Sequence, residues 1–440
     1  MFKNGLSYRG IMMLVLLSHI SLLGIVYFHT TAGEYERVWG VVQLALFILG
    51  SDLLYFLTLR LMRQATYTID FVLITILNMS TIFQSCFGGI GFAAKHFVMS
   101  VGCFICCQLS YLFTRNAEKT ELRKPWFYGA FGLLVLLILF CTGSRSMWID
   151  FGFITVQPSE FLKPVFVLIC ATSIAAQQNK QKTLGLMLVR DNFCVYGCAV
   201  LIFALQWWCR DLGSLPTFMA VAVCGLIARL SYPRAKLSKR LVLSLVAVGL
   251  LVCALAVRFA PAYVIERLYP DIWADPSGSG YQQCKALIAI AEGGWFGKGP
   301  GRGSLYRVAA SNTDIVFSTI CEEWGLIMAL LAVGLILLLL ATTLMNPPRS
   351  YFHSTVATGV CAVFIVQMAL NIFGSCNLIP FTGVTIPFIS QGGSSMLATG
   401  ILVGFLKATQ SPLFHHEAPA VSGVKQTKKK KVKRKGAVAK

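Results

Sequence analysis

Residues 311–344 read SNTDIVFSTICEEWGLIMALLAVGLILLLLATTL. The polar start of this stretch contains Asp314, and the apolar run that follows contains only two charged side chains, Glu322 and Glu323. A continuous helix from Asp314 to Leu344 would measure about 46 Å, which exceeds the roughly 30 Å of hydrocarbon in a bilayer. We therefore predict a membrane span whose first turns, with all three carboxylates, stand at or above one membrane surface.

The same apolar character recurs along the whole chain, in which 56% of the 440 residues are hydrophobic and 13% are charged. This composition excludes a soluble globular domain. We predict an all-α polytopic membrane protein with about twelve transmembrane helices, because each apolar run can cross the hydrocarbon as a helix. The predicted spans are Gly10–Phe28, Val38–Leu57, Ile69–Ile90, Phe92–Phe113, Phe127–Gly143, Phe161–Ala176, Asn192–Trp208, Leu215–Leu230, Leu241–Phe259, Ile315–Leu344, Tyr351–Phe373 and Thr385–Leu406.

The loop charges predict the orientation of these spans. Lys and Arg gather in alternate loops, which is typical of loops that face the cytoplasm. This pattern places both termini in the cytoplasm and the long polar insert at residues 260–314 outside. Nine of the positive charges behind the net charge of +20 lie in residues 425–440. We interpret residues 411–440 as a basic, disordered cytoplasmic tail beside anionic membrane lipids, and we expect no nucleic-acid partner.

The insert is rich in glycine and in cations. It contains GSGYQ at residues 278–282 and EGGWFGKGPGRG at residues 292–303. The second motif lacks the GK[ST] of a nucleotide-binding loop. Its backbone N–H groups, together with Lys298 and Arg302, are nevertheless suited to binding a diphosphate, and Arg267 adds a further cation. The alternative is a flexible loop that binds nothing.

Three more polar segments lie at the predicted outer ends of spans. Residues 143–163 read GSRSMWIDFGFITVQPSEFLK and include Arg145 and Lys163. Lys163 enters the apolar layer, where an ionisable side chain is a functional candidate, although it could instead extend toward the headgroups. Residues 209–214 read CRDLGS, and residues 371–395 read NIFGSCNLIPFTGVTIPFISQGGSS. The glycines and prolines of this last segment indicate unwound backbone, either around a cavity or as a packing loop.

Taken in order, these segments resemble the SEDS family of shape, elongation, division and sporulation proteins, also called FtsW/RodA/SpoVE. The resemblance covers residues 143–406. The sequence departs from the family pattern at Asn312, where a histidine is usual, and in CRDLG, where the family usually has QPDLG. The matching elements are Trp148 followed by QPSEFLK at 157–163, DLGS at 211–214, GSGYQ at 278–282, GGWFGKG at 293–299, TDIVFSTICEEWG at 313–325 and TGVTIPFISQGGSS at 382–395.

Members of this family are polytopic glycosyltransferases of the bacterial plasma membrane. They polymerise lipid II, an undecaprenyl-diphosphate-linked disaccharide peptide, usually beside a class B penicillin-binding protein. The resemblance implies a catalytic role for Asp314 and substrate-binding roles for Thr382 and Ser394. It also implies a core of about ten spans with two extra N-terminal ones. We therefore divide the chain into N-terminal helices at residues 1–126, a catalytic membrane core at residues 127–410 and the basic tail.

Under this hypothesis Asp314 is the general base that accepts the proton of an attacking sugar hydroxyl, while undecaprenyl diphosphate departs. The candidate diphosphate ligands are Arg145, Lys163, Arg267, Lys298 and Arg302, and a divalent cation, Mg²⁺ or Mn²⁺, is a candidate cofactor. Two other functions stay open, a lipid II flippase and a non-catalytic scaffold or activator of a penicillin-binding protein. From the residues alone, Asp314 could also merely complement the dipole of the helix after it.

Overall fold

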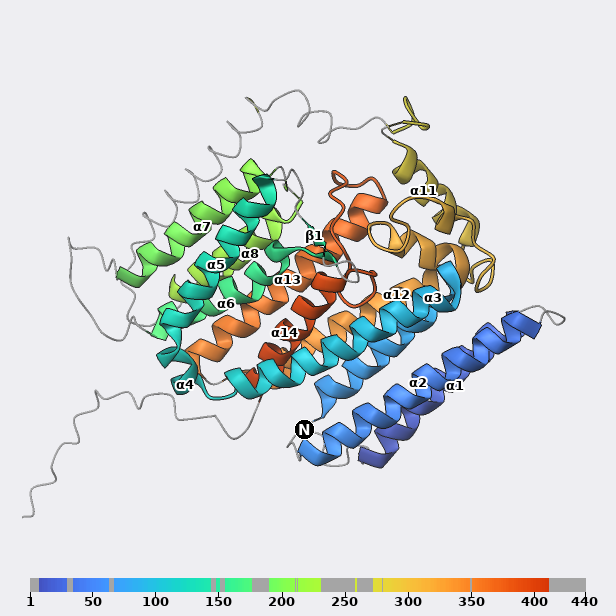
Figure 1. The fold of residues 1–440 in the computed structure, drawn as a ribbon, viewed down its shortest axis with the longest axis horizontal. Helices are drawn as coiled ribbons and strands as arrows, with labels where there is room; N and C mark the ends of the chain where they lie inside the picture. The colour runs from blue at the N-terminus through green and yellow to red at the C-terminus, as the bar shows by residue number, and fades with distance from the viewer. Residues whose placement is uncertain are drawn as a thin grey trace, which may run out of the picture.

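The computed structural model describes residues 8–29, 35–62, 67–143, 148–150, 155–175, 190–209, 211, 213–230, 258, 272–278, 280–348 and 350–410. Nearly all regular structure within these ranges is helical, and the long helices pack side by side as a bundle (Figure 1). A bundle is expected, because helices satisfy their own backbone polar groups within the hydrocarbon.

The helices and strands have the following bounds. The α-helices are α1 (Tyr8–His29), α2 (Tyr35–Met62), α3 (Thr68–Thr114), α4 (Ala117–Leu122), α5 (Lys124–Gly143), α6 (Pro158–Ala175), α7 (Arg190–Trp208), α8 (Leu215–Leu230), α11 (Tyr281–Gly293), α12 (Val316–Met345), α13 (Tyr351–Ser375) and α14 (Gly393–Thr409). The short elements are the 3-10 helix η2 (Leu305–Arg307) and the antiparallel strands β1 (Ile149–Asp150) and β2 (Thr155–Val156), in which Ile149 pairs with Val156.

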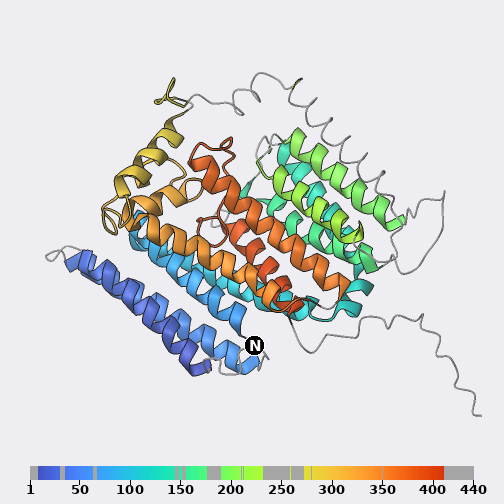
Figure 2. The same cartoon turned by 180° about the vertical axis from the view of Figure 1, so that it is seen from behind.

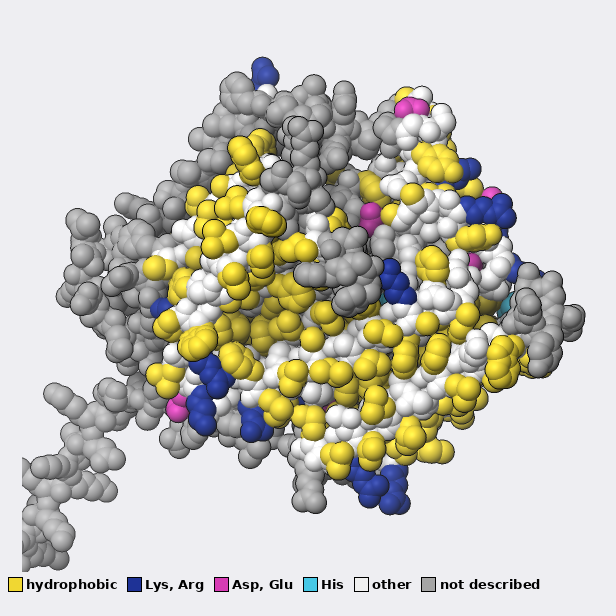
Figure 3. All heavy atoms as spheres, viewed as in Figure 1, with side chains coloured by type: hydrophobic (Ala, Val, Ile, Leu, Met, Phe, Trp, Pro, Cys, Tyr) yellow, Lys and Arg dark blue, Asp and Glu magenta, His cyan; other side chains and the backbone are white. Residues whose placement is uncertain are grey.

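The prediction of a polytopic helical membrane protein is confirmed. Among the described residues, five helices, α1, α2, α3, α12 and α13, are long and apolar enough to cross a membrane, and α5, α7 and α8 contain shorter apolar segments. Hydrophobic side chains cover the middle of the face in Figure 3, while Lys and Arg lie near α4 and at the ends of α1 and α2. The predicted span Leu241–Phe259 lies outside the described residues, except for Arg258.

Helix α3 contains two predicted spans joined by a sharp kink. Gly88 and Gly89 have non-helical backbone angles, and Gly89 has a φ of 73°. The kink thus lies close to the boundary between the predicted spans Ile69–Ile90 and Phe92–Phe113. Figures 1 and 2 show both halves of α3 in the bundle, with α14 packed alongside.

The contact between α3 and α14 depends on two glycines spaced four residues apart. A Cβ atom on Gly400 would lie 2.3 Å from the carbonyl oxygen of Cys103, and one on Gly404 would lie 2.3 Å from that of Cys107. Ser110 also donates from Oγ to the carbonyl of Ile401 at 3.0 Å. Small residues at this spacing allow two membrane helices to approach closely.

Two boundaries differ from the sequence predictions. Helix α12 begins at Val316, after Asp314, and it is broken at Gly325, whose φ and ψ are 82° and 166°. The break occurs because the chain before Gly297 packs against it, with Leu326 N donating to Gly294 O at 2.9 Å. The predicted continuous helix from Asp314 is therefore wrong. Helix α14 begins at Gly393, whereas the predicted span began at Thr385.

The N-terminal helices α1 and α2 form a pair that packs against α3 (Figures 1 and 2). A fully buried polar chain joins the three helices. His19 Nδ1 lies 2.8 Å from Asp52 Oδ2, Asn78 donates to Asp52 Oδ1 at 2.8 Å, and Ser51 donates to Asn78 at 3.0 Å. Polar side chains buried between membrane helices in this way hold the helices together.

Replacing Gly404 by Ala should destabilise the bundle, because the added methyl group meets the backbone of α3. We expect a loss of about 1–3 kcal/mol, the usual cost of overpacking. Gly334→Ala is the matched control, since a Cβ there has no atom within 4 Å. Thermal unfolding in detergent, followed by tryptophan fluorescence, measures both variants. Equal melting temperatures would contradict the close α3–α14 contact.

Candidate functional site

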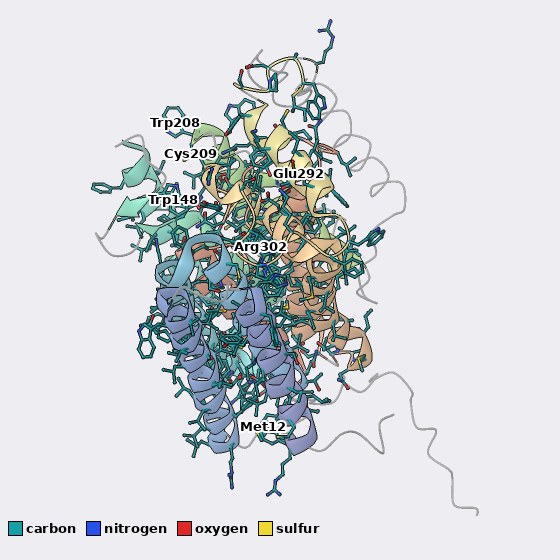
Figure 4. All side chains as sticks on the ribbon, turned by 90° about the vertical axis from the view of Figure 1, so that its right-hand side faces the viewer. Met12, Trp148, Trp208, Cys209, Glu292 and Arg302 are labelled. Atoms are coloured by element: carbon teal, nitrogen blue, oxygen red, sulfur yellow. The ribbon has the colours of Figure 1, made fainter. Side chains whose placement is uncertain are left out.

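The polar segments found in the sequence gather at one end of the bundle. Figure 4 places Trp148, Trp208 and Cys209 at the same end of the molecule as Glu292 and Arg302, opposite Met12. The candidate site is built at this end, from the chain that precedes α12, the irregular segment 376–392 between α13 and α14, and the start of α6 and α8.

Asp314 lies in a compact turn immediately before α12. Its backbone N–H donates to the carbonyl of Ala310 at 2.9 Å, and Ala310 itself has a φ of 59°. Thr319, one turn into the helix, donates from Oγ1 to the carbonyl of Ser311 at 2.8 Å. The turn is thus fixed from within and by the helix it precedes.

Two side chains from distant parts of the sequence fix the same turn from outside. Asn371, near the end of α13, donates from Nδ2 to the carbonyls of Asp314 at 2.8 Å and of Val384 at 2.7 Å. Ser390 donates from Oγ to the carbonyl of Thr313 at 2.6 Å. The turn that holds Asp314 and the segment 376–392 are therefore bound to one another and to α13.

The carboxylate of Asp314 faces the backbone of Gly383. This glycine has a φ of 67°, and a Cβ on it would lie 3.2 Å from Asp314 Oδ2. Burial raises the pKa of Asp314 to about 6, although a hydrogen bond from Thr313 acts in the opposite direction. A partly buried carboxyl group with a pKa near neutrality is suited to accepting a proton at physiological pH.

The DLGS motif at residues 211–214 packs against Thr382, the residue before Gly383. A Cβ on Gly213 would lie 2.6 Å from the carbonyl oxygen of Thr382, so only glycine permits this approach. Next to it, Asp211 accepts from Ser214 Oγ at 2.9 Å and from Gln157 Nε2 at 3.5 Å. Burial raises the pKa of Asp211, while Ser214 and then Lys163 act against that rise.

Lys163 lies one turn into α6. Its side chain is 2% exposed, and its Nζ donates to Glu160 Oε1 at 2.6 Å. It therefore does not extend to solvent, as the alternative interpretation required. The structure instead includes it in a buried polar cluster with Glu160 and Asp211, whose charges it partly offsets.

Glu322 and Glu323 form a second cluster, which holds the glycine-rich loop. Buried Glu322 accepts from the backbone of Ser304 at 2.9 Å and of Leu305 at 2.8 Å, while Glu323 accepts from Gly301 N at 2.8 Å. Of these N–H groups, that of Gly301 belongs to the motif predicted to bind a diphosphate, and it already has a carboxylate partner. The two glutamates therefore have a structural role in shaping residues 298–305.

Lys298 also belongs to this second cluster. Its Nζ pairs with Glu322 at 2.9 Å and with Glu292, and the hydrogen bonds that it donates to Glu292 and Glu322 raise the pKa of Lys298. Arg302 is exposed, and its backbone N–H donates to the carbonyl of Gly299 at 3.0 Å. Binding of diphosphate by Lys298 and Arg302 stays a prediction, and for Lys298 it requires competition with two carboxylates.

The remaining predicted site residues differ in how far the structure describes them. Thr382 Oγ1 and Ser394 Oγ are buried and have no hydrogen-bond partner among the described residues, and their binding of substrate stays a prediction. Arg145 and Arg267 lie outside the described residues. In the part of the chain that is described, no three His, Cys, Asp or Glu side chains converge as metal ligands do.

The sequence predictions did not single out the two residues that position Asp314. Asn371 is 1% exposed and Ser390 is 4% exposed. A signal existed for Asn371, an amide within an otherwise apolar run, because such a side chain must bond to something inside the bundle. The sequence signal for Ser390 was its place in the motif TGVTIPFISQGGSS at residues 382–395.

Replacing Glu322 by Gln should loosen the glycine-rich loop, because an amide cannot accept from Lys298, Ser304 and Leu305 as a carboxylate does. We expect faster amide hydrogen exchange at residues 301–305 and a local loss of about 3 kcal/mol. Glu292→Gln is the control, since its side chain is 49% exposed and should cost less than about 1 kcal/mol. Unchanged exchange in the Glu322 variant would show that the loop does not depend on this carboxylate.

Comparison with known proteins gives consistent matches. The family model FTSW_RODA_SPOVE, described as cell cycle protein, matches residues 53–412. The probable peptidoglycan glycosyltransferase FtsW of Pseudomonas fluorescens is 32% identical over 297 residues, which cover 64% of this chain and 71% of the relative. Stage V sporulation protein E of Bacillus subtilis is 31% identical over 337 residues, which cover 73% of this chain and 84% of the relative.

Two solved structures share the fold. A chain from a peptidoglycan synthase complex, in a study of coordinated polymerization and crosslinking, matches with a TM-score of 0.58 at 20% identity, covering 78% of this chain and 97% of that one. The crystal structure of the rod shape determining protein RodA of Thermus thermophilus matches with a TM-score of 0.52 at 19% identity, covering 78% and 96%.

Proposed function

The chain belongs to the FtsW/RodA/SpoVE family, and from this membership we propose that it is a peptidoglycan glycosyltransferase of the membrane. The substrate we propose is lipid II, a disaccharide peptide carried on undecaprenyl diphosphate. Its long prenyl chain would lie in the bilayer beside the helices, which brings the diphosphate and sugars to the end of the bundle where Asp314 lies. The product would be a glycan strand, with undecaprenyl diphosphate released.

The observation that carries this proposal is the environment of Asp314. A sugar hydroxyl is a poor nucleophile, so its attack on the anomeric carbon of another unit needs a positioned group to accept the proton. Asp314 supports this role because its backbone is bound by Asn371 and its carboxylate faces the backbone of Gly383. No ATP is needed, since the donor carries its own leaving group.

The departing diphosphate needs positive charge or hydrogen-bond donors. Thr382 and Ser394 supply buried, unpartnered hydroxyls, and Lys163 supplies a buried cation near Asp211. Mg²⁺ is commonly held by one or two carboxylates together with substrate phosphates. Asp314 is the carboxylate that we place beside the substrate, so a divalent cation would take most of its ligands from the diphosphate itself.

We further propose the surroundings of the enzyme. Both termini would be cytoplasmic, which puts the end with Asp314 outside a bacterial plasma membrane, as the loop charges favour. A class B penicillin-binding protein would be the partner. Support for a partner comes from the similar chain found in a peptidoglycan synthase complex.

The replacement Asp314→Asn tests the base role. It keeps the size and polarity of the side chain but removes the proton acceptor, so polymerisation of labelled lipid II by purified protein should fall by about 10²–10⁴-fold. Asp275→Asn is the matched control, because Asp275 is an exposed acid that accepts from Gly278 N at 2.9 Å, which an amide oxygen can also do.

Each alternative function has its own result in this experiment. Equal polymer from wild type and Asp314→Asn would end the assignment of the base. Translocation of lipid II across reconstituted vesicles without polymer would indicate a flippase. Full complementation of a deletion strain by Asp314→Asn would indicate a scaffold or activator of the penicillin-binding protein.

The raised pKa of Asp314 predicts the pH dependence of the reaction. A base must be ionised to accept a proton, so activity should be full well above pH 6 and should fall about tenfold per pH unit below it. An enzyme whose base had an ordinary carboxyl pKa near 4 would keep its full activity down to a pH about two units lower. The measurement is kcat/KM from pH 5 to 8, with unfolding followed at each pH. A flat profile down to pH 5 would contradict the assignment.

A further inference from the structure

A pocket lies beside the turn that holds Asp314. It occupies about 210 Å³ between the kink of α3 and the chain that leads from η2 into the turn. Its walls include the rings of Phe87, Phe92 and Tyr306 and the polar residues Ser311 and Asn312. None of the described residues that line it is charged. The pocket is thus aromatic on one side and carries an amide and a hydroxyl on the other.

The kink of α3 builds the aromatic side. A Cβ on Gly88 would lie 2.4 Å from the ring of Phe92, so the ring can fold back over this position only because it is glycine. Phe92 is 42% exposed and Tyr306 is 44% exposed, whereas Phe87 is buried. Two ring surfaces are therefore partly open to a ligand, and the third forms the base of the pocket.

The pocket and Asp314 are mechanically connected. Ala310 lines the pocket and accepts the N–H of Asp314 at 2.9 Å. The amide of Asn312 donates to Gln391 Oε1, and Gln391 Nε2 donates to the carbonyl of Phe92 at 3.1 Å. Both walls of the pocket are therefore tied to the segment that also faces Asp314.

We propose that this pocket is a glycan subsite, which holds one saccharide ring of the strand next to the sugar that reacts at Asp314. The inference rests on the proposed function. Aromatic rings pack against the C–H face of a sugar, while a few polar groups select its hydroxyl or acetamido substituents. The absence of charge in the lining argues against the diphosphate, and the amide and hydroxyl argue against a prenyl chain.

A subsite of this kind retains the strand between additions. Weakening it should shorten the product, because a loosely held strand dissociates sooner. The first coupling of two lipid II molecules should be spared, because no longer strand exists at that stage. The subsite therefore predicts that strand length and initial coupling rate respond differently to substitution.

The test uses the full-length protein with Phe92→Leu, Tyr306→Ala and the double variant. Phe92→Leu keeps apolar bulk but removes the flat ring, and Tyr306 is exposed enough to be truncated without disturbing the core. Phe140→Ala is the matched control, an 82% exposed aromatic residue of α5 outside the pocket and outside the glycine-rich motif. We measure the initial rate of coupling of labelled lipid II and the length distribution of the glycan on gels.

We expect mean strand length to fall at least fivefold in the double variant, with the initial rate within about twofold of wild type and no change in the control. A soluble N-acetylglucosamine tetrasaccharide should shorten wild-type strands by competition and affect the double variant less. Unchanged lengths, or a rate that falls together with length, would overturn the subsite. The subsite would also be overturned if the double variant made strands of normal length and its activity depended differently on the length of the prenyl chain. A wild-type protein that makes no polymer would instead refute the proposed function.

Discussion

The arrangement of the site depends on the side-chain amide of Asn371. From the end of α13 it donates to the carbonyls of Asp314 and Val384, and so joins two segments that are separated by two membrane helices in the sequence. Ser390 adds a second connection at Thr313. These bonds fix the backbone on both sides of the Asp314 carboxylate. A carboxylate positioned by neighbouring rigid elements needs little reorganisation when it reacts.

The carboxylates at this end of the bundle differ in the number of hydrogen bonds that they accept, and we assign them different roles on that basis. Glu322 accepts from Lys298, Ser304 and Leu305, so it is committed to holding the glycine-rich loop. Asp314 is partly buried but receives little hydrogen bonding, which leaves it able to exchange a proton. Glu322 thus shapes the loop, while Asp314 stays available for the base role that we propose.

The sequence predicted the helical membrane architecture, because apolar runs of spanning length leave few alternatives. It also singled out Asp314, Thr382 and Ser394 through their motifs, and their roles stay predictions. It did not predict the break at Gly325, since the packing of the Gly294 region requires it, and the motif that ends at Gly325 does not state that the helix breaks there. Nor did it identify Asn371 as the connection, because its partners are backbone carbonyls. Backbone partners of this kind are specified by the fold and not by a motif.

The polar chain His19–Asp52–Asn78 has a consequence for how the molecule is assembled. Separating all three helices would leave the Asp52 carboxylate without both His19 and Asn78 inside the hydrocarbon, at a cost of several kcal/mol. We therefore expect the three helices to stay packed together. The face of α3 that α1 and α2 cover is then closed to a transmembrane helix from another protein.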